Sequence, residues 1–304
     1  MPRLLLAALA LTACQDAPPA KEFDGQAAMA YAKTQLDFGP RIPGTPGHKQ
    51  MADWLDSTLR KRADTVVAQS WMHVSIKGDS VPMRNFVARF NTKATRRILF
   101  LTHWDSRPIA DQDTGSRAKQ PVPAANDAAS GVAVQLVMAD LLKKTPPTVG
   151  VDLLFVDGED FGLFDDQEAD VLIGSRYYAE HQPPGPAPEY AVLLDMVGAK
   201  GAKFPKEGNS LTGAPDIVEK VWTMAARMGY SGIFVDESNG AVTDDHLPLQ
   251  KAGIKAIDVI PRLGRNSGDG GYPYWHTIDD TLDKLAVETL KAMGDVMMGL
   301  ARAR

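Results

Sequence analysis

The chain has 304 residues, of which 44% are hydrophobic and 23% are charged, and its formal net charge is −5. This composition is typical of a globular protein and argues against a disordered, collagen-like or coiled-coil chain, while the length allows a core without disulfides or a structural metal. No basic stretch dominates, which argues against a nucleic-acid partner, and no apolar run reaches the roughly 18 to 20 residues that a membrane-spanning helix needs.

The first residues have the features of an export signal. Arg3 precedes a short apolar stretch and then small residues, which is the pattern of a secretory signal peptide. The LTAC segment at 11–14 resembles the lipobox of bacterial lipoproteins, in which the chain is cut before a cysteine that then carries lipid. We expect a signal peptide over 1–13, a lipid anchor at Cys14 and a flexible tether over 14–22. A plain signal peptide or a buried first helix is the alternative.

This interpretation predicts a protein that is exported and lipid-anchored to a bacterial membrane, on its periplasmic or cell-surface side. Cys14 is the only cysteine of the chain, so the mature fold would contain no thiol. A cysteine nucleophile, a zinc ribbon and a disulfide scaffold are therefore excluded together.

Apolar residues alternate between helical spacing and short continuous runs. In chain order, the pattern predicts a helix over 24–36, a Gly- and Pro-rich loop over 38–47, a helix over 48–61, strands over 65–76, 85–90 and 97–102, a helix over 130–142, strands over 151–156 and 190–196, a helix over 215–228, a strand over 255–260 and a helix over 282–300. Helices that alternate with buried strands indicate an α/β fold. We expect one domain over 23–304, with a central, mostly parallel but mixed sheet flanked by helices.

Polar residues follow the predicted strands or precede the next helix. They are His103, Asp105, Asn126, Asp127, Glu159, Asp160, Asp195, Asp244, Asp245, His246, Trp275 and His276. In open α/β sheets, ligands gather at the carboxyl ends of the strands. Without cysteine, a zinc site needs His, Asp and Glu ligands. The candidates at this stage are Asp127, Glu159 or Asp160, Asp195, His103 and His276.

The adjacent acids Glu159 and Asp160 suggest two different roles. On a loop that leaves a strand, both cannot point at one ion, so one can ligate while the other works as general base or acid. A solvated turn is the structural alternative for this pair. The histidines His48, His73 and His181 have no acidic neighbours in the sequence, and we interpret them as surface or packing residues.

Several of these segments together resemble a known family. They are FGPRIPGTPG, THWDSRP, ANDAASG, FVDGEDFG, IGSRYYA, LLDMVGAKGAKFPKEGNS, TDDHLPL and YWHTIDDTLDKL. From about Phe38 to the C-terminus, the chain is similar to glutaminyl-peptide cyclotransferases (glutaminyl cyclases), which share the fold of zinc aminopeptidases. Asp244, Trp275 directly before His276, and the long insertion after Asp160 resemble the cyclases more than the peptidases.

The resemblance implies a role for each metal-site residue. Asp127, Asp160 and His276 would hold a single zinc ion, and Glu159 beside them would be the general acid and base. His103 stands where the aminopeptidases have a ligand for a second ion, whereas in cyclases it is usually not a ligand.

The resemblance also implies how the substrate is held. Asp195 and Asp244 would form a hydrogen-bonding dyad beside the general acid, and Trp275 would pack on the substrate side chain. Phe161 and Phe164 occupy the stretch where animal-type cyclases have a tryptophan, so we expect them to form part of the pocket wall.

The activity implied is conversion of the N-terminal Gln of peptides or proteins to pyroglutamate, with release of ammonia and with one zinc ion as cofactor. A first alternative is a two-zinc aminopeptidase, in which His103 and Asp195 would also bind metal. A second alternative is a lipoprotein that keeps the fold as a non-catalytic binding module. The sequence predicts neither the physiological substrates nor the oligomeric state.

Overall fold

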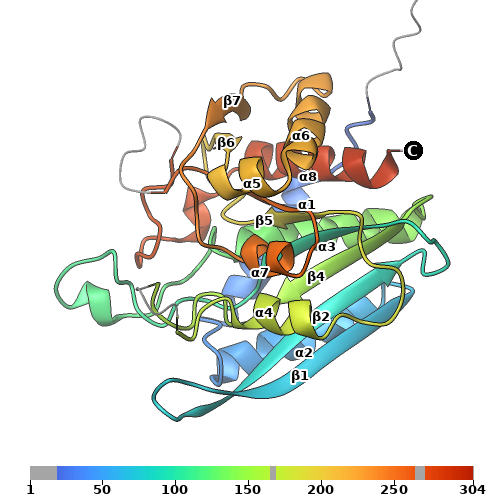
Figure 1. Ribbon diagram of the computed structural model, residues 1–304. Helices are drawn as coiled ribbons and strands as arrows, with labels where there is room; N and C mark the ends of the chain where they lie inside the picture. Colours follow the sequence, from blue (N-terminus) through green and yellow to red (C-terminus); the bar gives the residue numbers. More distant parts are fainter. Residues whose placement is uncertain (1–18, 165–168, 264–270, 304) are drawn as a thin grey trace, which may run out of the picture.

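A six-stranded mixed sheet forms the centre of the computed structural model, which describes residues 19–164, 169–263 and 271–303 (Figure 1). The strand order is β1-β2-β4-β3-β5-β8. β1 and β2 are antiparallel to their neighbours, while β4, β3, β5 and β8 run parallel. The strands are β1 Thr65–Val74, β2 Ser80–Phe90, β3 Arg97–His103, β4 Gly150–Val156, β5 Ala191–Leu194 and β8 Ala256–Val259.

Helices cover both faces of this sheet, and a small parallel pair of strands lies beside it. The helices are α1 Gly25–Leu36, α2 Pro46–Arg60, α3 Ala129–Lys144, α4 Ile173–Glu180, α5 Gly208–Gly213, α6 Pro215–Arg227, α7 His246–Lys251 and α8 Val287–Arg302, with 3-10 turns at η1 Arg117–Lys119 and η3 Leu282–Lys284. The small pair consists of β6 Phe204–Lys206 and β7 Phe234–Ser238.

The alternation of side chains along each strand explains why both faces are covered. In β3, Ile98 and Phe100 belong to the larger core cluster, with residues of α1, α3 and α8, whereas Leu99 and Leu101 face the other side, with residues of α4 and α7. A strand buried on both faces needs a mostly apolar sequence. β5 is entirely apolar, and β3 and β4 contain apolar runs, while the buried Arg97 of β3 pairs with the buried Asp152 of β4. The predicted α/β fold with a mixed sheet is confirmed.

Most predicted elements are present, with shifted ends. Asp24 caps α1 as expected, because its carboxylate accepts hydrogen bonds from the backbone N–H groups of Gln26 and Ala27. The strand predicted over 85–90 begins earlier, at Ser80. The helix predicted over 282–300 begins only at Val287, because residue 285 pairs with Ala199 in an isolated β-bridge.

Several short elements were not predicted. They are α4, α5, α7, β6 and β7, and each has at most eight residues. Segments this short contain about two turns or fewer, so they show little periodicity. Helix α5 forms because the Glu207 side chain accepts hydrogen bonds from the N–H groups of Asn209 and Ser210 at its start.

The predicted lipid anchor at Cys14 lies outside the described residues. The described end of the predicted tether already contacts the domain, since the Lys21 ammonium lies 4.1 Å from the ring centre of Tyr230 and Glu22 pairs with Arg302. Over the described ranges, none of the helices combines the length and apolar character needed to cross a bilayer.

Candidate metal centre

The polar residues identified in the sequence meet at one edge of the sheet. His103 is the last residue of β3, Glu159 and Asp160 follow β4, and Asp195 follows β5. The three acids, but not His103, line a small pocket of about 50 Å³. Its lining consists of Asp127, Glu159, Asp160, Phe164, Asp195, Met196, Val242, Thr243, Asp244, Ile260, Leu263, Trp275 and His276. The carboxyl-end location is the one expected for a ligand site in an open α/β sheet.

Two carboxylates and one histidine lie close enough together to hold a metal ion, and a second histidine contacts both carboxylates. Ligand atoms of His103, Asp127 and Asp160 all lie within 4.8 Å of one another. His276 Nε2 lies 3.2 Å from Asp160 Oδ1 and 3.7 Å from Asp127 Oδ2. The residues predicted to hold zinc, Asp127, Asp160 and His276, are therefore brought together, and His103 lies beside them.

Asp127 has one oxygen toward each histidine. Its Oδ1 lies 3.0 Å from His103 Nε2, while Oδ2 faces His276. His103 Nε2 also lies 3.2 Å from Asp195 Oδ1. The geometry thus offers one group of ligands with Asp160 and His276 and a second with His103 and Asp195, and Asp127 belongs to both.

The chemistry of this cluster fits a divalent cation. Asp127, Glu159, Asp160 and Asp195 are all buried, and Asp160 Oδ2 has no hydrogen-bond partner among the described residues. Burial, together with Asp160 and Asp195, raises the pKa of Asp127 to about 7. Buried carboxylates that repel one another need a positive charge, and N and O donors of this kind are typical zinc ligands.

The two histidines are oriented by further carboxylates. His103 Nδ1 lies 3.3 Å from Asp105 Oδ1, and His276 Nδ1 lies 3.1 Å from Asp111 Oδ1. Burial alone would lower the pKa of His276, but Asp160 and Asp111 outweigh it and raise the pKa to about 9. A carboxylate on the far ring nitrogen commonly directs the other nitrogen of a histidine toward a metal.

Asp105 also fixes the loop that carries the paired acids. Its Oδ1 accepts a hydrogen bond from the backbone N–H of Glu159 at 3.2 Å, and its Oδ2 accepts one from the N–H of Asp160 at 3.1 Å. Asp105 is fully buried. One side chain at the end of β3 therefore positions both acids that follow β4. The sequence placed Asp105 at a strand end but assigned it no role.

Arg107 is a buried cation beside the candidate ligands. Its Nη1 donates to Asp160 Oδ1 and to the carbonyl oxygen of Gly162, each at 3.1 Å, and its Nη2 donates to Asp111. Despite burial, His276 and Arg107 hold the pKa of Asp160 below its usual range. Arg107 thus keeps this acid ionised and connects it to the carboxylate that orients His276.

Asp280 holds the backbone around Asp127 in place. Its two oxygens accept hydrogen bonds from the N–H groups of Asn126 and Asp127, at 2.8 and 3.1 Å, and from the hydroxyl of Tyr272. The peptide bond between Asp127 and Ala128 is cis. Neither Asp280 nor Tyr272 was identified as a site residue from the sequence.

Glu159 lies beside the ligand cluster and lines the pocket. Burial, with Asp160, Asp244 and Asp245, raises its pKa well above the usual range. A carboxyl group whose pKa is raised by burial can serve as a general acid or base. Its position is compatible with the predicted role of a general acid and base.

Asp195 and Asp244, the residues of the predicted dyad, both line the pocket, and the hydrogen bond between them stays a prediction. Asp195 faces His103, and Asp244 Oδ1 accepts a hydrogen bond from the N–H of Asp245. Burial, with Asp195 and Asp245, raises the pKa of Asp244 well above its usual value.

The predicted aromatic residues divide between two places. Trp275 and Phe164 line the pocket, and the Trp275 ring stacks on His276 with centroids 4.1 Å apart. Phe161 does not line this pocket. It packs against a small cluster of Val81, Met83 and Ile173 and lines a separate hollow. Phe161 therefore does not form part of the wall of this pocket as expected, since it packs on Val81, Met83 and Ile173 instead.

Two of the other histidines have acidic partners after all. His48 Nε2 lies 2.9 Å from Asp157 Oδ1, and His73 Nε2 lies 2.7 Å from Asp170 Oδ1. These acids are more than 90 residues away in the chain, so the sequence did not suggest the pairs. None of the three histidines interpreted as packing or surface residues lines the candidate pocket.

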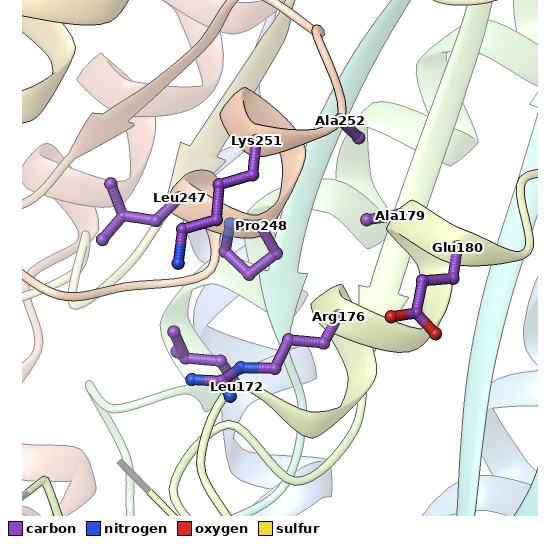
Figure 2. Close-up of a pocket in the computed structure, with 8 residues that line it drawn as sticks. All are labelled: Leu172, Arg176, Ala179, Glu180, Leu247, Pro248, Lys251 and Ala252. Carbon is purple, nitrogen blue, oxygen red and sulfur yellow. The ribbon is translucent and has the colours of Figure 1, made fainter. Parts of the chain in front are cut away.

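A larger hollow of about 330 Å³ lies between α4 and α7. Figure 2 shows Leu247, Pro248 and Lys251 of α7 opposite Arg176 and Glu180 of α4. Among the described residues of its lining, Glu180 is the only one with a carboxylate. The chemistry-bearing groups therefore point to the smaller pocket as the candidate site.

A family match agrees with this location. Residues 85–301, which include every residue of the pocket, match Peptidase family M28. The chain belongs to this family. Peptidase family M28 therefore accounts for the fold and for the candidate metal centre, while the individual reaction needs further evidence.

The solved structures that are similar to this chain include both a glutaminyl cyclase and an aminopeptidase. The solved structure of glutaminyl cyclase from Bacteroides thetaiotaomicron has a TM-score of 0.88 and 36% identity, covering 95% of this chain and 100% of that chain. A leucine aminopeptidase precursor from the same species has a TM-score of 0.87 and 36% identity, covering 93% and 98%. Overall similarity therefore does not separate the two activities.

A relative found by sequence is also named an aminopeptidase. Aminopeptidase YwaD of Bacillus subtilis is 28% identical over 205 residues, which are 66% of this chain and 39% of that protein. The matched part thus spans less than half of that relative, whereas the two solved structures are matched over nearly their whole length.

Proposed function

We propose that this member of Peptidase family M28 is a glutaminyl-peptide cyclotransferase, which converts the N-terminal Gln of peptides or proteins to pyroglutamate and releases ammonia. The observation that carries the proposal is the placement of Asp244 and Trp275 in one pocket with Glu159. Asp244 and Trp275 are the two residues whose sequence context resembles cyclases more than aminopeptidases. Similarity to a solved bacterial glutaminyl cyclase at 36% identity supports the same activity.

The residues of the pocket fit the reaction that this proposal requires. Asp127, Asp160 and His276 would hold a zinc ion, which supplies Lewis-acid polarisation of the γ-carbonyl. The α-nitrogen forms a bond to the carbonyl carbon of the side-chain amide (Cδ), and the bond from that carbon to the side-chain nitrogen breaks. Glu159 takes a proton from the α-amine and returns it to the leaving nitrogen, so that ammonia departs.

Both reacting groups belong to one residue, so the protein has mainly to orient them. Trp275 offers an aromatic wall for the substrate side chain, and Ile260 and Leu263 add apolar surface beside it. A narrow pocket of about 50 Å³ would exclude most water from the amine and the carbonyl. Asp195 and Asp244 line the same pocket and would bind the α-amine.

A Gln-initiated peptide incubated with the zinc-loaded protein tests the proposal. We expect mass spectrometry to show a mass decrease equal to one ammonia. The product peptide should no longer have a free N-terminal amine for amine-reactive reagents. A peptide with N-terminal Leu is the matched control and should remain unchanged. Loss of a whole residue from either peptide would instead identify an aminopeptidase.

One observation favours that second activity. Asp127 has an oxygen toward each of two histidines, and Asp195 stands beside His103, so ligands for two ions are present. In an aminopeptidase, Glu159 would activate water for attack on the peptide bond. A stoichiometry of two zinc ions per chain would favour this reading, and one ion per chain favours the cyclase.

A non-catalytic binding module has less support. Relatives that lose catalysis usually lose ligands, and here all candidate positions carry suitable side chains and converge. A protein that takes up no zinc at neutral pH would support this alternative.

We also propose export and lipid anchoring at Cys14, on the strength of the LTAC segment alone. Metabolic labelling with a fatty acid should mark the wild-type chain and leave Cys14→Ala unmarked. Equal labelling of both proteins would contradict this part of the proposal.

A further inference from the structure

Exposed apolar side chains gather beside the catalytic pocket. In the described part of the chain, the large hydrophobic residues with high exposure are Met72, Val74, Ile76, Ile109, Leu163 and Phe164. Phe164 lines the catalytic pocket, and three others line one neighbouring hollow of about 330 Å³. Exposed apolar residues that gather around one hollow mark a binding surface more often than residues scattered singly.

The hollow is formed by three segments of the chain. Ile76 belongs to the turn after β1 and is 66% exposed, Ile109 follows the buried Arg107 and is 38% exposed, and Leu163 is 49% exposed. Phe161 also lines the hollow. Its wall therefore contains aliphatic and aromatic side chains that solvent reaches but no described residue covers fully.

The hollow and the catalytic pocket share a wall. Phe161, Gly162 and Leu163 line the hollow, and the next residue, Phe164, lines the catalytic pocket. Consecutive Cα atoms are about 3.8 Å apart, so the residues that line the two spaces are direct neighbours in the chain at this point. When the first residue of a peptide occupies the pocket, this segment is one wall that the following residues can contact.

The walls of the hollow are held in place by hydrogen bonds. Arg107, which binds the candidate ligand Asp160, also donates to the carbonyl oxygen of Gly162 at 3.1 Å. Asp170 accepts a hydrogen bond from the N–H of Ile76 at 3.0 Å and contacts His73 at 2.7 Å. Arg107 therefore ties the loop wall to the candidate ligand Asp160, and Asp170 holds the hairpin wall of the hollow.

We infer that this hollow is a subsite for an apolar side chain at the second or third position of the peptide substrate. The inference rests on the proposed cyclase function and extends it from the reacting residue to the residues that follow. Ile109, Leu163 and Phe161 contact the apolar side chain, and the volume of about 330 Å³ is large enough for aliphatic or aromatic groups. Peptides with Leu after the N-terminal Gln are preferred over peptides with Ser.

The test compares ammonia release from Gln-Leu-Leu and Gln-Ser-Ser peptides by the zinc-loaded enzyme. Burial of aliphatic groups in a pocket gives roughly 10- to 200-fold discrimination, so we expect the wild type to prefer the Leu peptide at least about 10-fold in kcat/KM. Ile109→Ser and Leu163→Ser should each reduce this ratio severalfold. Val74→Ser is the matched control, because Val74 is 63% exposed on the same hairpin but does not line the hollow.

The possible outcomes distinguish failure of the subsite from failure of the proposed cyclase function. The subsite is overturned if both peptides release ammonia with a kcat/KM ratio near one. It is also overturned if Ile109→Ser and Leu163→Ser leave this ratio unchanged. A loss of the ratio in Val74→Ser as well also overturns it. Absence of ammonia from every Gln peptide overturns the cyclase function instead. Release of Ile109→Ser from phosphatidylcholine vesicles that retain the wild type would assign the surface to lipid and refute the subsite.

Discussion

The substitution Asp105→Asn tests how the fold positions the paired acids. In the wild type, one oxygen of Asp105 accepts from the N–H of Glu159 at 3.2 Å and the other accepts from the N–H of Asp160 at 3.1 Å. Asparagine has the same shape but only one acceptor oxygen, so one of these buried N–H groups would face an NH₂ group. Leaving a buried donor unsatisfied costs about 1 to 3 kcal/mol.

We therefore expect Asp105→Asn to lower the free energy of unfolding by about 1 to 3 kcal/mol, measured by urea denaturation. Loss of a residue that supports metal ligands commonly costs about 10- to 100-fold in metal affinity or activity, and kcat/KM should fall within that range. Asp37→Asn is the control, because its carboxylate is exposed and forms a surface ion pair with Lys33. Wild-type stability together with wild-type kcat/KM in Asp105→Asn would refute the reasoning.

Three further substitutions test the electrostatics, the ligands and the pocket wall. Burial raises the pKa of Asp245 to about 7, so its protonated carboxyl group favours the folded state at low pH, and this contribution is lost as the pH rises through about 7. Between pH 5 and pH 8, the free energy of unfolding of metal-free Asp245→Asn should therefore increase relative to that of the wild type in urea titrations. A difference that does not change with pH would contradict the raised pKa. Asp127→Asn and His276→Ala should each weaken zinc binding in a chelator competition, and wild-type affinity in both would remove them from the ligand set. Phe164→Ala should raise KM for glutamine amide more than Phe161→Ala does, since only Phe164 lines the pocket, and equal effects would contradict that placement.

The strand ends could be predicted from the sequence because the central strands contain apolar runs. Every residue of β3 and β4 is buried, and polar residues stand at or soon after the carboxyl ends of these strands. This pattern was enough to select His103, Glu159 and Asp160. The resemblance to cyclases then added Trp275 and the division of roles between the paired acids.

The residues that support the site could not be predicted from the sequence, because their partners lie far away along the chain. Asp280 acts on Asn126 from 154 positions away, and Arg107 acts on Asp160 from 53 positions away. A charged side chain in a loop gives no sign of such a partner until the fold is known. The direction of a side chain in an irregular segment is equally hidden, which is why Phe161 was assigned to the wrong hollow.

The central claim is that Glu159 moves protons beside a zinc ion that other side chains hold. Glu159→Gln tests it most directly, with zinc content and turnover of a Gln-initiated peptide measured on the same preparation. We predict that zinc content stays at the wild-type level while kcat falls by about 10²- to 10⁴-fold, the usual contribution of a general acid and base. Turnover near the wild-type rate, or a loss of zinc in proportion to the loss of turnover, would contradict the claim.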